Sequence, residues 1–175
     1  MYLKLLISAV LINFSSLGLG RFSYGMILPD LQNSLQISTT KVGFIGTANF
    51  IGYMIAIFFV SYLYKKHEAS LLISLSLALQ GLSMFCMIFY SDYILISFFY
   101  MLSGFFAAVS NVSIMIYIAH IVPSNIKGKA LGITVTGIGF AIIFSGFIVP
   151  YIESLVLNDA WKINWAIFSI LIIVI

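Results

Sequence analysis

The sequence predicts an all-α membrane protein with six transmembrane helices, and three observations support this fold class. First, 62% of its 175 residues are hydrophobic, only 7% are charged, and the mean hydropathy is +1.16, far more apolar than in a soluble domain. Second, apolar runs recur, most of them at least as long as the roughly 20 residues that cross a bilayer. Third, the runs are continuously apolar instead of alternating, which favours helices over the strands of a barrel.

The runs follow one another along the whole chain and are separated by short polar connections that carry almost all of the charge. They span residues 5–28, 42–64, 70–90, 93–121, 130–151 and 163–175. A lysine precedes the first run and no small-residue cleavage site follows it, so we expect a retained helix and not a signal peptide. The last run, at ~1.5 Å per residue, gives roughly 20 Å of helix, short of a full crossing. We therefore favour a polypeptide truncated in its sixth helix over a short, tilted helix.

The lysines in the connections indicate the orientation of the chain. With a cytoplasmic N-terminus, more of them lie inside than outside, as the positive-inside rule requires. The lysines inside would be Lys4, Lys65, Lys66, Lys127 and Lys129, and those outside Lys41 and Lys162. We expect an integral protein of the bacterial cytoplasmic (inner) membrane with its N-terminus in the cytoplasm.

Several other functions are disfavoured. The net charge of +3 is scattered along the chain without a basic face, so we expect no nucleic-acid partner. Cys86 is the only cysteine, which excludes an intramolecular disulfide and a CxxC metal or redox motif. The two histidines, His67 and His120, lie in a connection and at a helix end, without the partners that catalysis needs. We expect no enzyme activity, no cofactor and no metal site.

Small and polar residues are concentrated in the first, second, fourth and fifth runs. Because small side chains let helix backbones approach closely, we expect these four helices to pack inside, the third near the periphery and the sixth against lipid. The glycines expected at helix contacts are Gly18, Gly20, Gly46, Gly52, Gly104, Gly132, Gly137 and Gly139.

Arg21 lies well inside the first run, where an arginine costs about 2.5–3.5 kcal/mol on insertion scales. None of the five acidic residues lies well inside a run, so the chain offers no intramembrane carboxylate to neutralise it. One interpretation is structural: the side chain bends toward the interface or caps carbonyls of a neighbouring helix. The other is functional: its guanidinium fork binds an acid from another part of the protein or the negative group of a solute.

Further polar residues are candidates for the same solute-binding site. Asn13, eight residues before Arg21, is expected on its face, with Tyr24 close by on the other side. The full set of candidate substrate-binding residues is Arg21, Asn13, Tyr24, Asn49, Asn111 and Tyr117. Each asparagine could instead form a hydrogen bond between helices, which is the more frequent role of a lone membrane asparagine.

Three segments, "GLGRFSYGMILPDLQ", "GFIGTANFIGYMIA" and "GITVTGIGFAIIFSGFIVP", resemble the N-terminal six-helix half of a major facilitator superfamily transporter. The resemblance is greatest to the YbfB/YjiJ-like branch, whose signatures G-x-G-R-F-x-Y and N-x-x-G-Y match Gly18, Gly20, Arg21, Phe22, Tyr24, Asn49, Gly52 and Tyr53. It implies a fold of two six-helix halves with the substrate bound between them at mid-membrane and access that alternates by rocking.

The sequence departs from the superfamily at two places. The connection "SYLYKKHEA" keeps the basic residues of the gating motif between the second and third helices but lacks its aspartate and glycines. Tyr100 stands where an arginine linked with proton coupling is expected, although Gly104 of the same pattern is retained. Whether a coupling proton accompanies the solute therefore stays open.

Together these observations predict secondary active transport of a small anionic or polar solute by alternating access. The alternative is a truncated or half-size membrane protein that has no transport activity alone and acts only in assembly with a second half. The expected partners are the lipid bilayer, a small-molecule substrate, and a missing C-terminal half or second subunit.

Overall fold

A computed structural model describes residues 2–156 and 159–175, and the chain is helical through nearly all of these residues. The elements in chain order are α1 (Leu3–Asn13), a π-helical segment η1 (Phe14–Phe22), α2 (Tyr24–Leu35), α3 (Thr39–Lys66), α4 (Ala69–Met87), α5 (Tyr93–Ile121), α6 (Lys127–Leu155) and α7 (Ala160–Val174). Within the described ranges, five continuous helical segments are long and apolar enough to cross a membrane, and α7 is a shorter apolar helix.

The first membrane helix consists of α1, η1 and α2 in one continuous rod, with a wide π-helical turn in its middle. It continues to Leu35, beyond the run that ends at residue 28, because Pro29 is accommodated inside α2. A left-handed Gln36 then ends the helix, and the amide of Ile37 donates to the carbonyl of Gln32 at 3.3 Å, as in a Schellman motif.

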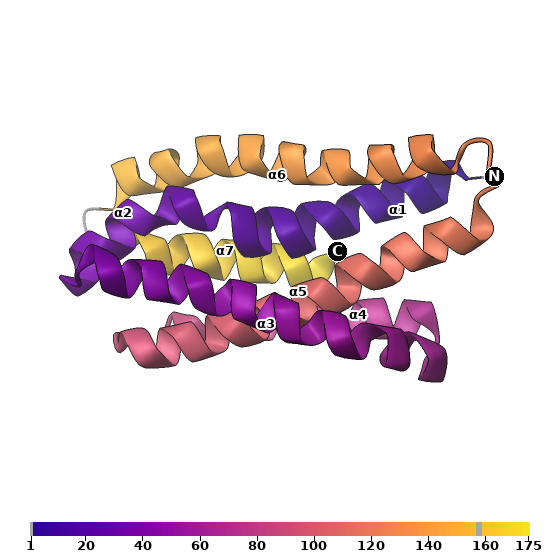
Figure 1. Ribbon diagram of the computed structural model, residues 1–175. Coiled ribbons are helices and arrows are strands. Elements are labelled where there is room, and N and C mark those ends of the chain that lie inside the picture. The colour runs from indigo at the N-terminus through magenta and orange to yellow at the C-terminus, as the bar shows by residue number, and fades with distance from the viewer. Residues whose placement is uncertain (1, 157–158) are drawn as a thin grey trace.

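The helices pack side by side in a bundle (Figure 1). α3 lies against α5 along much of its length, α4 lies between α5 and α7, and the rod of α1 and η1 packs on α6. Glycines permit the closest of these approaches: a Cβ added at Gly52 would overlap the Met101 carbonyl, one at Gly104 the Asn49 carbonyl, and one at Gly137 the Val10 carbonyl. These contacts confirm close approaches by glycines of α3, α5 and α6. The expected arrangement is wrong in part: α4, expected near the periphery, is half buried, whereas α3 and α6, expected inside, are largely exposed in this chain.

The sixth membrane helix, α7, is packed against the bundle on one face, whereas the scarcity of small residues predicted that it would face lipid. Trp161, Trp165 and Phe168 are fully or almost fully buried, while Ile163 and Ile170 are exposed on the other face. The small residue at this contact belongs to the partner helix, since Gly81 of α4 lies against Ile173 and the carbonyl of Ser169. Asp30 of α2 also accepts a hydrogen bond from the Trp161 amide at 2.6 Å, which ties the start of α7 to the first helix.

Large apolar side chains, mainly phenylalanines and isoleucines, are exposed over much of α3 and α6. A soluble domain would bury such continuous surfaces. Here they lie on helices of membrane-spanning length and composition, so the chain is an integral membrane protein.

Candidate functional site

The centre of the candidate site is Arg21, which the π-helical segment η1 places against α3. The guanidinium carbon lies 3.7 Å from the ring centroid of Phe50 and 4.6 Å from that of Tyr53. Both rings come from α3, one turn apart. Cation–π contacts of this kind contribute roughly 0.5–2 kcal/mol each, more as the cation is desolvated. The aromatic pair therefore holds a charge that the sequence leaves without an intramembrane carboxylate.

Hydrogen-bonding capacity remains on the Arg21 side chain. Its Nε atom is buried and has no hydrogen-bond partner within the described residues. The ion pair among the described residues joins Lys162 and Asp159 at the start of α7, and it involves no group near Arg21. Rings that stack on the face of a guanidinium leave its N–H edge available, and this edge is what pairs with a carboxylate or phosphate.

A chain of hydrogen bonds runs from the aromatic pair across four helices. The Tyr53 hydroxyl donates to Asn111 Oδ1 at 3.1 Å, and Asn111 Nδ2 donates to Asn13 Oδ1 at 2.6 Å. Asn13 Nδ2 in turn donates to the Thr134 carbonyl at 3.0 Å. These bonds link α3, α5, α1 and α6 in that order. Asn13 is completely buried in this chain, so it is connected to Arg21 through Asn111 and Tyr53 instead of sharing an open face with it.

Asn49 has a different role in the structure. Its Nδ2 donates to the Tyr100 carbonyl at 3.0 Å, where α3 crosses α5 beside Gly104. This is the helix-to-helix bond that the sequence offered as an alternative to a solute contact. Its Oδ1 is buried and has no partner among the described residues.

Tyr24 and Tyr100 complete the surroundings of Arg21. The Tyr100 hydroxyl donates to the Arg21 carbonyl at 3.3 Å, and the Tyr24 hydroxyl donates to the Val42 carbonyl at 2.8 Å. The two tyrosine rings lie 5.2 Å apart, and Trp165 of α7 is 5.8 Å from Tyr100. Gly46 lies against this cluster, where an added Cβ would be 3.1 Å from the Tyr24 ring, tighter than an ordinary contact.

Tyr117 lies apart from this group. It lines a separate cavity of about 310 Å³ between α1, α4 and α5, with Ser8, Ser70 and Ser74. The structure therefore brings together Arg21, Tyr53, Asn111 and Asn13, places Tyr24 next to them through Tyr100, and separates Tyr117.

The expected packing glycines also divide into two groups. Gly18 and Gly20 face Ala141 and Gln80 closely, and Gly46, Gly52, Gly104 and Gly137 have the contacts described above. By contrast, a Cβ added at Gly132 or Gly139 would meet no atom of the described chain within 4 Å. These two glycines are thus open positions on α6.

Phe50, Tyr53, Tyr100 and Trp165 lie at the candidate site but were not among the candidate substrate-binding residues expected from the sequence. Apolar and aromatic residues are abundant in every run, and only their position against Arg21 distinguishes them. Among the described residues there is also no group of three or more His, Cys, Asp or Glu side chains that could hold a metal ion.

A model of the Major Facilitator Superfamily matches residues 10–175. The fold is similar to an inward-open structure of the xylose transporter XylE from E. coli, with a TM-score of 0.73 and 17% sequence identity over 99% of this chain. The chain spans 47% of the length of that transporter, about half. No curated protein matches the sequence. Because the family model covers nearly the whole sequence, the chain belongs to the Major Facilitator Superfamily.

Proposed function

We propose that this chain forms one half of a secondary active transporter, which moves a small anionic or polar solute across the membrane by alternating access. Membership of the superfamily and the similarity of the fold to half of a sugar transporter support transport as the function. The observation that carries the choice of solute is Arg21, a stacked intramembrane guanidinium with a buried, unpartnered Nε among the described residues.

In this proposal, Arg21 supplies the positive charge of the solute site. Phe50 and Tyr53 hold the guanidinium against α3, and its N–H groups bind a carboxylate or phosphate of the solute, or an acid of the second half when no solute is bound. Tyr53 links the site by hydrogen bonds to the buried pair Asn111 and Asn13. A movement of Tyr53 on solute binding would therefore alter the hydrogen bonds where four helices meet.

A second half is part of the proposal, because superfamily substrates bind between two six-helix units. The length match of 47% supports it. The surface of α6 supports it as well. Gly132, Gly139 and Gly146 follow there at intervals of seven residues, and a Cβ added at any of them would meet no described atom within 4 Å. Such a row lets another helix approach closely. The second candidate function follows from the same observation: a half-size protein that is active only after assembly with a separate subunit.

The proposal extends to location and branch. The excess of lysines on the N-terminal side supports a cytoplasmic N-terminus in a bacterial inner membrane. The G-x-G-R-F-x-Y and N-x-x-G-Y signatures support the YbfB/YjiJ-like branch, since Arg21 and Tyr53, one from each signature, are in contact.

The test is uptake by the complete transporter in proteoliposomes, with radiolabelled monocarboxylates, dicarboxylates, amino acids and hexoses as probes. We expect uptake of a carboxylate that Arg21→Ala abolishes without loss of membrane insertion. Arg21→Lys should also be impaired, because an ammonium cannot form the two-pronged contact of a guanidinium. Lys41→Ala, at the exposed start of α3, is the matched removal of a cation and should transport normally. Carboxylate uptake unchanged by Arg21→Ala would exclude Arg21 from the site.

A further inference from the structure

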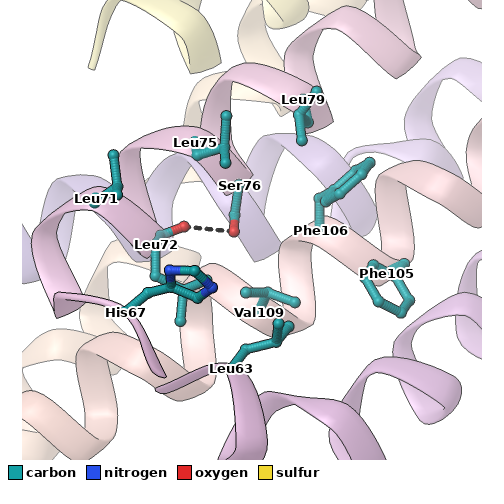
Figure 2. A pocket seen from close by; sticks show the side chains of 10 residues that line it. All are labelled: Leu63, His67, Leu71, Leu72, Leu75, Ser76, Leu79, Phe105, Phe106 and Val109. Carbon is teal, nitrogen blue, oxygen red and sulfur yellow. Dashed lines mark hydrogen bonds between the residues drawn. The ribbon is translucent and has the colours of Figure 1, made fainter. Parts of the chain in front are cut away.

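A groove on the surface of the bundle lies outside the Arg21 site. It is bounded by the end of α3, the first three turns of α4 and the middle of α5, and has a volume of about 250 Å³. Figure 2 shows leucines of α3 and α4 facing Phe105, Phe106 and Val109 of α5 across it. Leu71 and Leu75 form an exposed rim.

The walls of the groove offer an occupant almost no hydrogen bonds. The single hydroxyl that lines it, that of Ser76, donates to the Leu72 carbonyl of its own helix at 2.6 Å (Figure 2). Apart from it, the lining side chains are apolar except for His67, which lies at one end. A polar solute would lose its hydration here without compensation, so the occupant is a hydrocarbon.

The dimensions of the groove correspond to one leaflet of a bilayer. Along α4 its lining extends from Leu71 to Leu79, about 12 Å at ~1.5 Å per residue. This is a little less than half of a hydrocarbon core of roughly 30 Å. An acyl chain of a single leaflet therefore has the required length and chemistry.

His67 lines one end of the groove and Lys66 precedes it at the end of α3, whereas Lys65 lines a separate pocket with Tyr64 and His120. Lys65 and Lys66 end α3, His67 follows, and the Lys66 ammonium lies 4.7 Å from the centre of the Tyr62 ring. Tyrosines together with lysines are typical of the membrane–water interface. Lysines near such a surface favour the binding of anionic lipid.

We propose that this groove binds an anionic phospholipid, with one acyl chain between α3, α4 and α5 and its phosphate beside Lys66 and His67. The site is independent of solute transport and of the Arg21 site.

The test is a lipid titration followed by native mass spectrometry. The purified full-length protein is stripped of lipid in detergent and titrated with dioleoyl phosphatidylglycerol or, separately, dioleoyl phosphatidylcholine. We expect one phosphatidylglycerol to bind at least tenfold more tightly than phosphatidylcholine. Leu75→Trp should fill the groove and weaken binding at least tenfold. Leu82→Trp is the matched control, because Leu82 is equally exposed, at 52%, on the same helix but outside the groove. Lys66→Gln with His67→Gln should reduce the affinity for phosphatidylglycerol to that for phosphatidylcholine.

Three results would overturn the proposal. Equal effects of tryptophan at 75 and 82 would show that lipid binds elsewhere, provided that both variants keep the melting temperature of the wild type. Equal affinity of the wild type for the two lipids would show that the groove does not select an anionic headgroup. Loss of a dimer peak in Leu75→Trp, with lipid binding unchanged, would assign the groove to a second copy of the chain.

Discussion

At the scale of single residues, Arg21 is held by rings and not by a carboxylate. Its charge centre lies over the rings of Phe50 and Tyr53, and its Nε has no hydrogen-bond partner among the described residues. Tyr53 combines two roles, because its ring contacts Arg21 and its hydroxyl begins the hydrogen bonds to Asn111 and Asn13. Removal of the hydroxyl alone separates these roles.

Tyr53→Phe should preserve the aromatic contact with Arg21 but leave Asn111 Oδ1 without its donor. We expect a loss of about 1 kcal/mol in the free energy of unfolding, since hydrogen bonds between membrane helices average ~0.6 kcal/mol and reach ~1.7. Transport should fall by less than in Arg21→Ala. Unfolding in mixed micelles and proteoliposome uptake measure the two effects. Tyr62→Phe, exposed on the same helix, is the control. Equal stability of the two variants would mean that the Tyr53 hydroxyl contributes nothing measurable.

At the scale of helices, the close packing of α3 against α5 depends on glycines at their contact. Gly52 faces the carbonyl of Met101 and Gly104 faces that of Asn49, so each helix brings a glycine to the backbone of the other. The Asn49 amide adds a hydrogen bond to the Tyr100 carbonyl at the same crossing. Since Phe50 and Tyr53 lie on α3, this crossing also fixes where the rings meet Arg21.

Gly52→Ala should push α3 away from α5, because the new Cβ would overlap a backbone carbonyl that cannot rotate away. Overpacking of this kind costs typically ~1–3 kcal/mol. Gly43→Ala on the same helix meets no atom within 4 Å and should be neutral or slightly stabilising, as alanine is the better helix former. Melting temperatures of the two variants in detergent test the comparison. A melting temperature of Gly52→Ala at or above that of Gly43→Ala would contradict the tight crossing.

The helices and six of the eight expected glycine contacts could be predicted from the sequence. The contact of Gly81, the π-helical turn and the packing of α7 could not. Hydrophobic length identifies a span, and small residues mark close approaches such as that of Gly52 and Gly104. The shift at η1 depends on tertiary bonds: Gln80 Nε2 donates to the Ser16 carbonyl at 2.7 Å, and Tyr100 to that of Arg21. The two acceptor carbonyls belong to the π-helical segment. A periodicity of 3.6 residues, which underlies the expected face of Asn13 and Arg21, does not hold across it.

The candidate site was predictable only in part for a related reason. An intramembrane arginine and buried asparagines are visible in the sequence because they are costly in lipid. Phe50 carries no such signal, and Tyr117 carries the same polar signal as Tyr53 but lies in another cavity. Which polar residues meet is decided by the crossing of helices.

At the scale of the whole molecule, the bundle leaves a glycine row without a partner. Gly18 and Gly137 join α6 to the first helix, but Gly132 and Gly139 meet no atom of the described chain within 4 Å. Large apolar residues such as Phe140 and Phe147 are exposed beside them on α6. Lipid can cover an apolar surface of any shape, whereas a row of glycines at intervals of seven residues matches another helix.

Gly139→Leu tests whether a second half covers this row. Because Gly139 has open space around it, the variant should not lower the melting temperature of the isolated 175-residue chain. In the complete transporter the same leucine should hold the facing helix away, and uptake should fall at least tenfold because alternating access requires two halves that rock on each other. Gly128→Leu, open as well but at the end of α6, is the control and should transport normally. Full transport by Gly139→Leu would show that this glycine faces lipid, and the second half would then have to pack on another surface.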